Sequence, residues 1–286
     1  MGINVHRSAL ISLSITTLLA PTAVTAADWS DTWMGYRTGG GYREPSNPNN
    51  IRKHILSVSH ASSYRFGSNF FTMDYLSSDD NDPAHSGDNG ATEFYFAYRH
   101  QLHWGKITGT PARFGPIRDM GLTAGFDLET KNSTFSPSKR MVVVGPTFKF
   151  DVPGFLDVSV VYAQEWGECG IPPCKEPGNH TDVTFDPFPR IEVAWNIPFE
   201  VRNVPLKFQG WSFYNGKKGK DYLNVETEAE HLIRPSLMVD VGQMLLKSKN
   251  TLWMGMGYEY RRNTYGNHGK TGVNTNTPTF NLEWHF

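Results

Sequence analysis

The chain has 286 residues, enough for one large domain or two modest ones. Its 13% aromatic content, together with 27 glycines and 18 prolines, disfavours a helical bundle and suits strands joined by turns. The 27 basic and 28 acidic residues give a formal charge of −1, so we expect no nucleic-acid partner.

The first residues are typical of a secretory signal peptide. Arg7 supplies a positive charge, an uncharged stretch covers Ala9 to Ala20, and the small residues Val24 and Ala26 stand three and one places before Ala27. The uncharged stretch is shorter than the roughly 20 residues of a membrane-spanning helix, which disfavours an uncleaved anchor. We therefore predict a signal peptide over residues 1–26 and one mature domain over residues 27–286.

The chain contains two cysteines, Cys169 and Cys174, separated by Gly170-Ile171-Pro172-Pro173. An exported protein meets an oxidising compartment, where two thiols are expected to pair. The proline-rich turn can hold them at bridging distance, so we predict a disulfide that closes a loop. A metal site would need more ligands at suitable spacing, and we predict no metal and no cofactor.

Stretches of alternating apolar and polar residues fill the mature chain, and no long window shows a helical period. Most run 10 to 14 residues, longer than the five or six usual in soluble sheets and suited to a tilted membrane crossing. The twelve predicted strands cover residues 33–37, 53–62, 68–77, 92–104, 117–130, 140–150, 155–166, 184–197, 205–215, 228–242, 251–262 and 277–286.

The connections between these stretches alternate in length. Short ones, such as 63–67 and 151–154, alternate with long ones rich in Gly, Asn, Asp and Pro, such as 38–52 and 167–183; the longer 105–116 is an exception. This alternation, with both termini on the short-turn side, is what an even-stranded outer-membrane barrel requires. We therefore predict an all-β fold, a closed antiparallel up-and-down transmembrane β-barrel of about 12 strands in a bacterial outer membrane.

The last predicted strand has aromatic or apolar residues at every second position, and the chain ends in Phe286. One face of such a strand meets lipid and the other meets water, because a Lys or Arg on the lipid face costs about 2–4 kcal/mol at mid-membrane. The pattern looks like the signal read by the outer-membrane assembly machinery. We expect outer-membrane lipid and this machinery as partners, with the signal carried by Phe280, Leu282, Trp284 and Phe286.

Twelve strands enclose a lumen between the filled interior of eight strands and the aqueous channel of sixteen. Alternation places acids, bases and aromatic residues on the lumen wall, which suits small neutral polar ring compounds through hydrogen bonds and stacking. The structural alternative is that these groups pair with one another and keep the barrel rigid. The candidate solute-binding residues are Tyr95, Arg99, Asp127, Glu129, Glu192, Trp211, Phe213, Arg234, Asp240, Glu259 and Arg261.

Five segments and the terminal strand carry a resemblance to a known family. The segments are Ile51–Leu56, Gly67–Asp74, Leu206–Trp211, Arg234–Gly242 and Gly255–Tyr260. They resemble the nucleoside-specific channel-forming outer-membrane proteins of the Tsx type, over most of the mature chain. The resemblance implies a monomeric twelve-stranded barrel that passes nucleosides by facilitated diffusion, with lumen aromatics and ionisable groups contacting base and sugar.

The sequence is also compatible with other functions. A channel for oligosaccharides would use similar wall chemistry, and an adhesin or a purely structural barrel would fit the long loops without requiring lumen charges. Twelve-stranded outer-membrane phospholipases use a His-x-Ser pair, which His60 and Ser62 match. However, Ser63-Tyr64-Arg65 departs from the expected Asn-Gly-Arg continuation, and His60 lies near the short-turn end. We therefore expect no enzyme.

Overall fold

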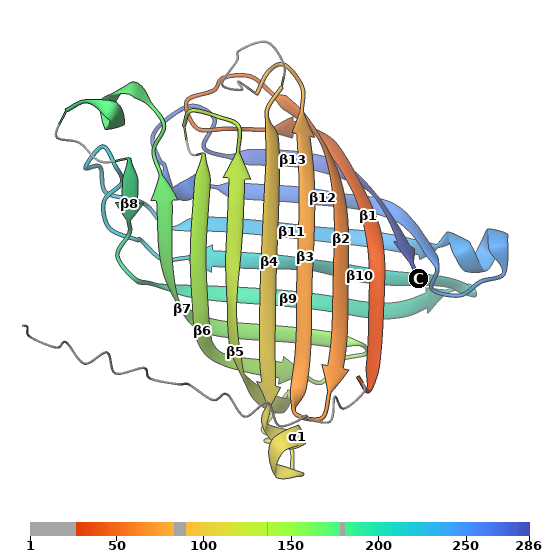
Figure 1. The fold of residues 1–286 in the computed structure, drawn as a ribbon. Coiled ribbons are helices and arrows are strands. Elements are labelled where there is room, and N and C mark those ends of the chain that lie inside the picture. The colour runs from red at the N-terminus through yellow and green to blue at the C-terminus, as the bar shows by residue number, and fades with distance from the viewer. Residues whose placement is uncertain (1–26, 83–89, 136, 178–180) are drawn as a thin grey trace, which may run out of the picture.

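The computed structural model describes residues 27–82, 90–135, 137–177 and 181–286. The predicted signal peptide, residues 1–26, lies outside the described residues. In the described part of the chain, thirteen strands form one sheet, and all of them except the short β8 make up a closed ring of twelve (Figure 1). The predicted closed antiparallel barrel is therefore confirmed.

The twelve ring strands run up and down, each paired antiparallel to its neighbours. The ring closes where β1 meets β13, from the pair Trp33–His285 to the pair Thr38–Phe280. The strands are β1 (Trp29–Tyr42), β2 (Ile51–Tyr64), β3 (Gly67–Ser78), β4 (Thr92–His103), β5 (Ile117–Lys131), β6 (Ser138–Phe150), β7 (Phe155–Glu168), β9 (Phe188–Val201), β10 (Val204–Asn215), β11 (Glu230–Asp240), β12 (Leu252–Arg262) and β13 (Thr275–His285).

All twelve predicted strands are present, with two main differences. The first, β1, extends through a glycine run, because Gly39 leaves room for Pro278 of β13, whose carbonyl oxygen lies 2.9 Å from where a Cβ would stand. The stretch predicted from residue 184 is split into β8 (Asp182–Thr184), which pairs with the end of β7, and β9. Between them, the backbone N–H groups of Phe185 and Asp186 donate to the carbonyl oxygens of Glu165 and Lys218, and Pro187 has no N–H to donate.

The outer face of the barrel is apolar. Side chains such as Leu56, Val144 and Met256 are half exposed there, as on the lipid-facing side of an outer-membrane barrel. Charged side chains that point outward occur only within three residues of either end of a strand, where the lipid layer gives way to water. These charges are Arg52, Arg118, Arg140, Glu168 and Arg262.

This outer surface, together with the closed ring of strands, defines a barrel of the bacterial outer membrane. Within the described ranges, no helix has the length and apolar character needed to cross a bilayer.

The inner face carries the charges and part of the packed core. Two apolar clusters lie inside the end of the barrel that bears the long loops. One joins Met141, Val143, Val161, Ala163 and Phe188 of strands β6, β7 and β9. The other joins Tyr42, Ile51, Ile55 and Leu76, with Tyr95 packed against it. These clusters narrow the lumen near the long loops.

The short segments mark the two ends of the barrel (Figure 1). At the short-turn end lie the helix α1 (Trp104–Thr108), which occupies the connection that departed from the predicted pattern, and the π-helical turn η2 (Gly242–Leu246). At the long-loop end lie two 3-10 turns, η1 (Pro172–Lys175) and η3 (Thr264–Gly266).

Candidate functional site

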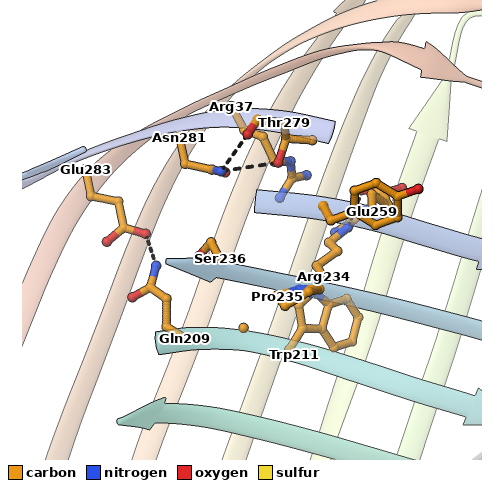
Figure 2. Close-up of a pocket in the computed structure, with 12 residues that line it drawn as sticks. Arg37, Gln209, Trp211, Arg234, Pro235, Ser236, Glu259, Thr279, Asn281 and Glu283 are labelled. Atoms are coloured by element: carbon orange, nitrogen blue, oxygen red, sulfur yellow. Dashed lines mark hydrogen bonds and ion pairs between the residues drawn. The ribbon is translucent and has the colours of Figure 1, made fainter. Parts of the chain in front are cut away.

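The lumen contains a cavity of about 150 Å³ at mid-barrel, which we call the mid-barrel cavity. Figure 2 shows its lining, which comes from β1 and from β10 to β13. Cationic, acidic, amide and aromatic side chains all contribute. The lining includes Arg37, Gln209, Trp211, Arg234, Glu259, Asn281 and Glu283.

A second cavity, of about 50 Å³, lies in the long-loop half of the barrel. Trp211 and Arg234 line both cavities. They therefore stand where the two spaces meet, with Arg234 lying over the indole ring at 5.8 Å from its centroid. The nitrogen Nε of Arg234 donates to Oε2 of Glu259 at 2.6 Å, which holds the guanidinium in place. This trio occupies the middle of the path along the barrel axis.

On the long-loop side of this trio, arginine and carboxylate side chains cross-link the strands of the barrel wall. Arg99 binds Asp127 at 2.6 Å and holds both oxygens of Glu192, at 2.6 and 2.9 Å. Arg190 also donates to Glu192 at 2.6 Å, and the hydroxyl of Tyr95 donates to Asp127 at 3.0 Å. Four of the predicted solute-binding residues, Tyr95, Arg99, Asp127 and Glu192, thus satisfy one another across strands β4, β5 and β9.

The cross-link continues around the wall. Arg190 donates to Asn215 at 2.6 Å, and Asn215 donates to Glu230 at 3.1 Å. Arg261 then closes the chain of contacts, because its Nη2 lies 2.6 Å from Glu230. Phe213 lies under Arg190, whose guanidinium carbon is 4.2 Å from the ring centroid. The predicted residues Phe213 and Arg261 therefore also belong to this structural network.

A loop residue that the sequence analysis did not single out, Tyr265 of η3, enters this network from outside. Its hydroxyl donates to Glu129 at 3.1 Å, its backbone N–H donates to Glu230 at 3.0 Å, and its ring lies 4.8 Å from the Arg261 guanidinium. Burial and the Glu129 carboxylate raise the pKa of Tyr265 well above its usual range. Its φ of 61° is uncommon for a residue with a side chain of this size. A tyrosine in a Gly- and Asn-rich loop gives no sequence signal of such an inward position.

A buried ionic cluster ties the loop after β1 to the mouth of the barrel. Glu44 lies 2.9 Å from both Lys53 and Lys131, and Lys131 lies 2.9 Å from Asp82. Burial opposes the ionisation of Glu44, but the ammonium groups of Lys131 and Lys53 outweigh it and hold its pKa well below the usual range. The loop is thus fastened by charges that the barrel wall supplies.

The structure gives Asp240 a different role from the predicted one. Its two carboxylate oxygens accept backbone N–H groups of Gln243 and Asn250, each at 2.8 Å. Asp240 therefore caps the turn between β11 and β12 at the short-turn end and lines neither cavity. Sequence alternation placed it correctly on the inner face but could not show that the following turn uses its oxygens.

The outer face of β13 carries three of the four predicted assembly residues. Phe280, Leu282 and Trp284 alternate with inward-facing Asn281 and Glu283, and Trp284 is 62% exposed. The final residue, Phe286, is 72% exposed, and its backbone N–H donates to the Thr32 carbonyl oxygen at 3.0 Å. All four side chains are therefore free of the lumen.

Cys169 and Cys174 form a disulfide in the long connection between β7 and β9, with their Cα atoms 6.1 Å apart. The bridge closes a small ring around η1 at the long-loop end. Across the described ranges, no cluster of three or more His, Cys, Asp or Glu side chains could hold a metal ion.

The wall chemistry and the fold together describe a lined lumen in an outer-membrane barrel. No protein-family model matches the sequence, and no curated protein matches it either. The structure is similar to the translocator domain of autotransporter NalP from Neisseria meningitidis, with 13% identity over 90% of this chain and 88% of that chain and a TM-score of 0.48.

It is also similar to the NanC porin, with 11% identity over 88% of this chain and 98% of that chain and a TM-score of 0.47. The beta domain of the Bordetella autotransporter Brka matches at 9% identity over 89% and 98% of the two chains, with a TM-score of 0.41. Such low identities say nothing of which solute this barrel meets.

Proposed function

We propose that the protein is a narrow outer-membrane channel for facilitated diffusion of small polar ring compounds, nucleosides first and oligosaccharides second. The observation that carries the proposal is the position of Trp211, an aromatic side chain lining both cavities beside an arginine–glutamate pair. The resemblance of the sequence to the nucleoside-specific Tsx-type channels supports nucleosides as the leading solutes.

The mid-barrel cavity offers the contacts that such a solute needs. The indole face of Trp211 can stack a base or a sugar ring for about 1–3 kcal/mol. Glu259 and Gln209, which line the same cavity, can take hydroxyl groups. Binding energies of this size correspond to fast exchange, which a conducting channel requires if the solute is to leave again.

We further propose that the barrel works as a monomer, without a cofactor and without enzymatic activity. Its partners are outer-membrane lipid and the assembly machinery, which reads the terminal strand. Deleting Phe286 should therefore reduce membrane insertion and abolish the heat-modifiable migration of the folded barrel on gels. Normal assembly of the shortened chain would contradict this role of the terminal residue.

Solute block of ion current in a planar bilayer tests the channel function. Nucleosides should reduce the current at micromolar to millimolar concentrations, the range of weak binding. Trp211→Ala should raise the half-blocking concentration about tenfold, as the loss of one stacking contact predicts. Trp104→Ala is the matched control, because Trp104 of α1 is 55% exposed at the short-turn end.

Each outcome decides between functions. Block by oligosaccharides but not by nucleosides would support the second class of solute and remove the first. A purified, folded barrel with neither conductance nor solute block would overturn the channel proposal. Lipid hydrolysis should then be assayed, because His60 and Ser62 lie two residues apart on β2.

A further inference from the structure

The connection between β11 and β12 is longer than the joining of two strands requires. It covers residues 241–251, whereas residues 65–66 join β2 to β3 and residues 202–203 join β9 to β10 at the same end of the barrel. In Figure 1 it is the blue coil that extends beyond the strand ends beside the C-terminus. We call it the β11–β12 turn. Most of its residues are therefore not needed to reverse the chain.

Hydrogen bonds fix the backbone of this turn at both of its ends. Both carboxylate oxygens of Asp240 accept backbone N–H groups of the turn, each at 2.8 Å. Near the other end, the Thr251 hydroxyl donates to the Ser248 carbonyl oxygen at 2.9 Å. Between these contacts lies η2, the single helical turn Gly242–Leu246. The side chains of η2 are therefore held in a fixed arrangement.

The tip of the β11–β12 turn is apolar and exposed. Met244, Leu245 and Leu246 are 56%, 75% and 64% exposed. Among the described residues, Leu245 has the highest exposed fraction of the large hydrophobic side chains. Three consecutive apolar side chains on a fixed turn are unfavourable in water, and such a patch marks a contact with lipid or with another protein.

Two lysines follow the apolar tip directly. Lys247 and Lys249 are exposed, and neither side chain forms an ion pair or a hydrogen bond with a described residue. No acidic residue lies within residues 241–251 to offset them. Apolar residues beside free cations are typical of segments that lie in the interface of a membrane with anionic headgroups. The charge of the turn therefore favours a lipid surface as the partner.

The apolar tip also continues the lipid-facing wall of the barrel. Leu252, which begins β12, pairs with Trp284 of β13, and Trp284 pairs with Met34 of β1. Trp284 and Met34 are 62% and 52% exposed on the outer face. Short turns of outer-membrane barrels lie on the periplasmic side. The tip therefore adjoins the periplasmic leaflet of the membrane.

We infer that the β11–β12 turn anchors this side of the barrel in the interface of the periplasmic leaflet. Met244, Leu245 and Leu246 enter the boundary of the acyl chains. Lys247 and Lys249 contact the phosphates of anionic phospholipid headgroups. This contact goes beyond the proposed channel function and does not depend on which solute the lumen meets.

A spin label at residue 245 tests the inference. Because Cys169 and Cys174 are bridged, the new thiol of Leu245→Cys is the one that reacts in the unreduced protein. The labelled barrel is placed in vesicles of phosphatidylethanolamine and phosphatidylglycerol. Frequent collision with oxygen and rare collision with a water-soluble nickel chelate indicate lipid around the label. Frequent collision with the chelate indicates water, and rare collision with both indicates a protein contact.

The label at residue 245 should report lipid, as should a label at Val144→Cys on the outer wall. Leu223→Cys is the matched control, because Leu223 is also an exposed leucine of a connection between strands but lies at the long-loop end, and it should report water. Water around residue 245 would overturn the inference. Rare collision with both reagents would overturn it as well and would indicate a second copy or another protein instead.

The lysines are tested by Lys247→Gln combined with Lys249→Gln in the same labelled chain. Each lost lysine should lower the ratio of inserted to free turn by up to about fivefold in vesicles with phosphatidylglycerol, the attraction of one cation to an anionic surface. Vesicles of phosphatidylethanolamine alone should show no such loss. Lys270→Gln, at the long-loop end, is the control. Equal insertion with and without phosphatidylglycerol in the unaltered turn would overturn the headgroup contact.

Heat-modifiable gel migration checks that each variant is folded. Solute block of ion current is a separate measurement, so the channel function and the lipid contact of the turn can fail independently.

Discussion

The two halves of the lumen use the same residue types in different ways. In the long-loop half, arginines and carboxylates bind one another, as Arg99 does with Asp127 and Glu192, and apolar clusters fill the space beside them. At mid-barrel, Trp211 and the Arg234–Glu259 pair stand beside a cavity of about 150 Å³. The open space beside the side chains, rather than the kind of residue, distinguishes the wall that stiffens the barrel from the wall that can meet a solute.

This difference follows from what burial costs a charge. A buried ion pair with good geometry leaves no donor available and resists disruption, because removing one partner strands the other without solvation. A cavity filled by water tolerates unpaired groups until a solute replaces that water. The long-loop half is therefore expected to govern stability, and the mid-barrel cavity is expected to govern solute selectivity.

Removing the centre of the cross-link should have the largest effect. Arg99→Met leaves Asp127 without its arginine and Glu192 with Arg190 alone, and breaking a buried pair costs about 3–5 kcal/mol. Unfolding by urea, followed through heat-modifiable migration, measures this loss. Arg113→Met is the control, because Arg113 is 67% exposed and should change the free energy of unfolding by less than about 0.5 kcal/mol. A similarly small loss for Arg99→Met would show that the cross-link is dispensable.

Loosening the loop tyrosine tests whether the long-loop half also limits conduction. Tyr265→Phe removes the hydrogen bond to the Glu129 carboxylate, which should weaken closure of this loop by about 1.5–3 kcal/mol. Single-channel recordings should show more frequent transitions to a higher conductance, and Tyr265→Ala should hold that level. Tyr222→Ala is the matched control, because this loop tyrosine packs against Phe135. Unchanged conductance in both Tyr265 variants would show that closure of this loop does not limit conduction.

Opening the disulfide should affect the barrel less. The chain-entropy account gives about 2 kcal/mol for a ring of this size as an upper value, and the ring lies in a loop outside the cross-linked wall. Cys169→Ser with Cys174→Ser should therefore leave the urea midpoint close to that of the unaltered protein. Thiol labelling of the unreduced, denatured chain should find no free cysteine. Labelling at both positions would refute the bridge.

Of these perturbations, acidification should have the smallest effect, which we expect to see in the loop held by Glu44. The pKa of Glu44 is lowered from 4.5 in the folded state by Lys131 and Lys53, so its stabilising charge persists above pH 4.5 and is lost only as pH falls through the lower folded value. Amide exchange of residues 43–50, corrected for the intrinsic pH dependence, should not rise between pH 7 and pH 5. Glu44→Gln should raise it at both values. A rise confined to the unaltered protein at pH 5 would contradict the lowered pKa.

Periodicity and loop length in the sequence were sufficient to determine the twelve crossings and the face of each side chain. A strand alternates with a period of two whatever its neighbours are, so Glu259 and Arg261 are predictably inward and Phe280 and Trp284 outward. The same rule did not predict the full length of β1, because glycines have no side chain and so show no apolar–polar alternation.

Only the closed barrel determines which inward-facing side chains contact one another. Arg99 and Glu192 are 93 residues apart in the chain, and Tyr265 and Glu129 are 136 apart. Their contacts depend on strand tilt, on register and on a loop that turns inward, none of which a local pattern contains. The same holds for Arg37, which alternation along β1 places inside but whose neighbour Asp74, 3.8 Å from its Nη2, is set by the folded wall.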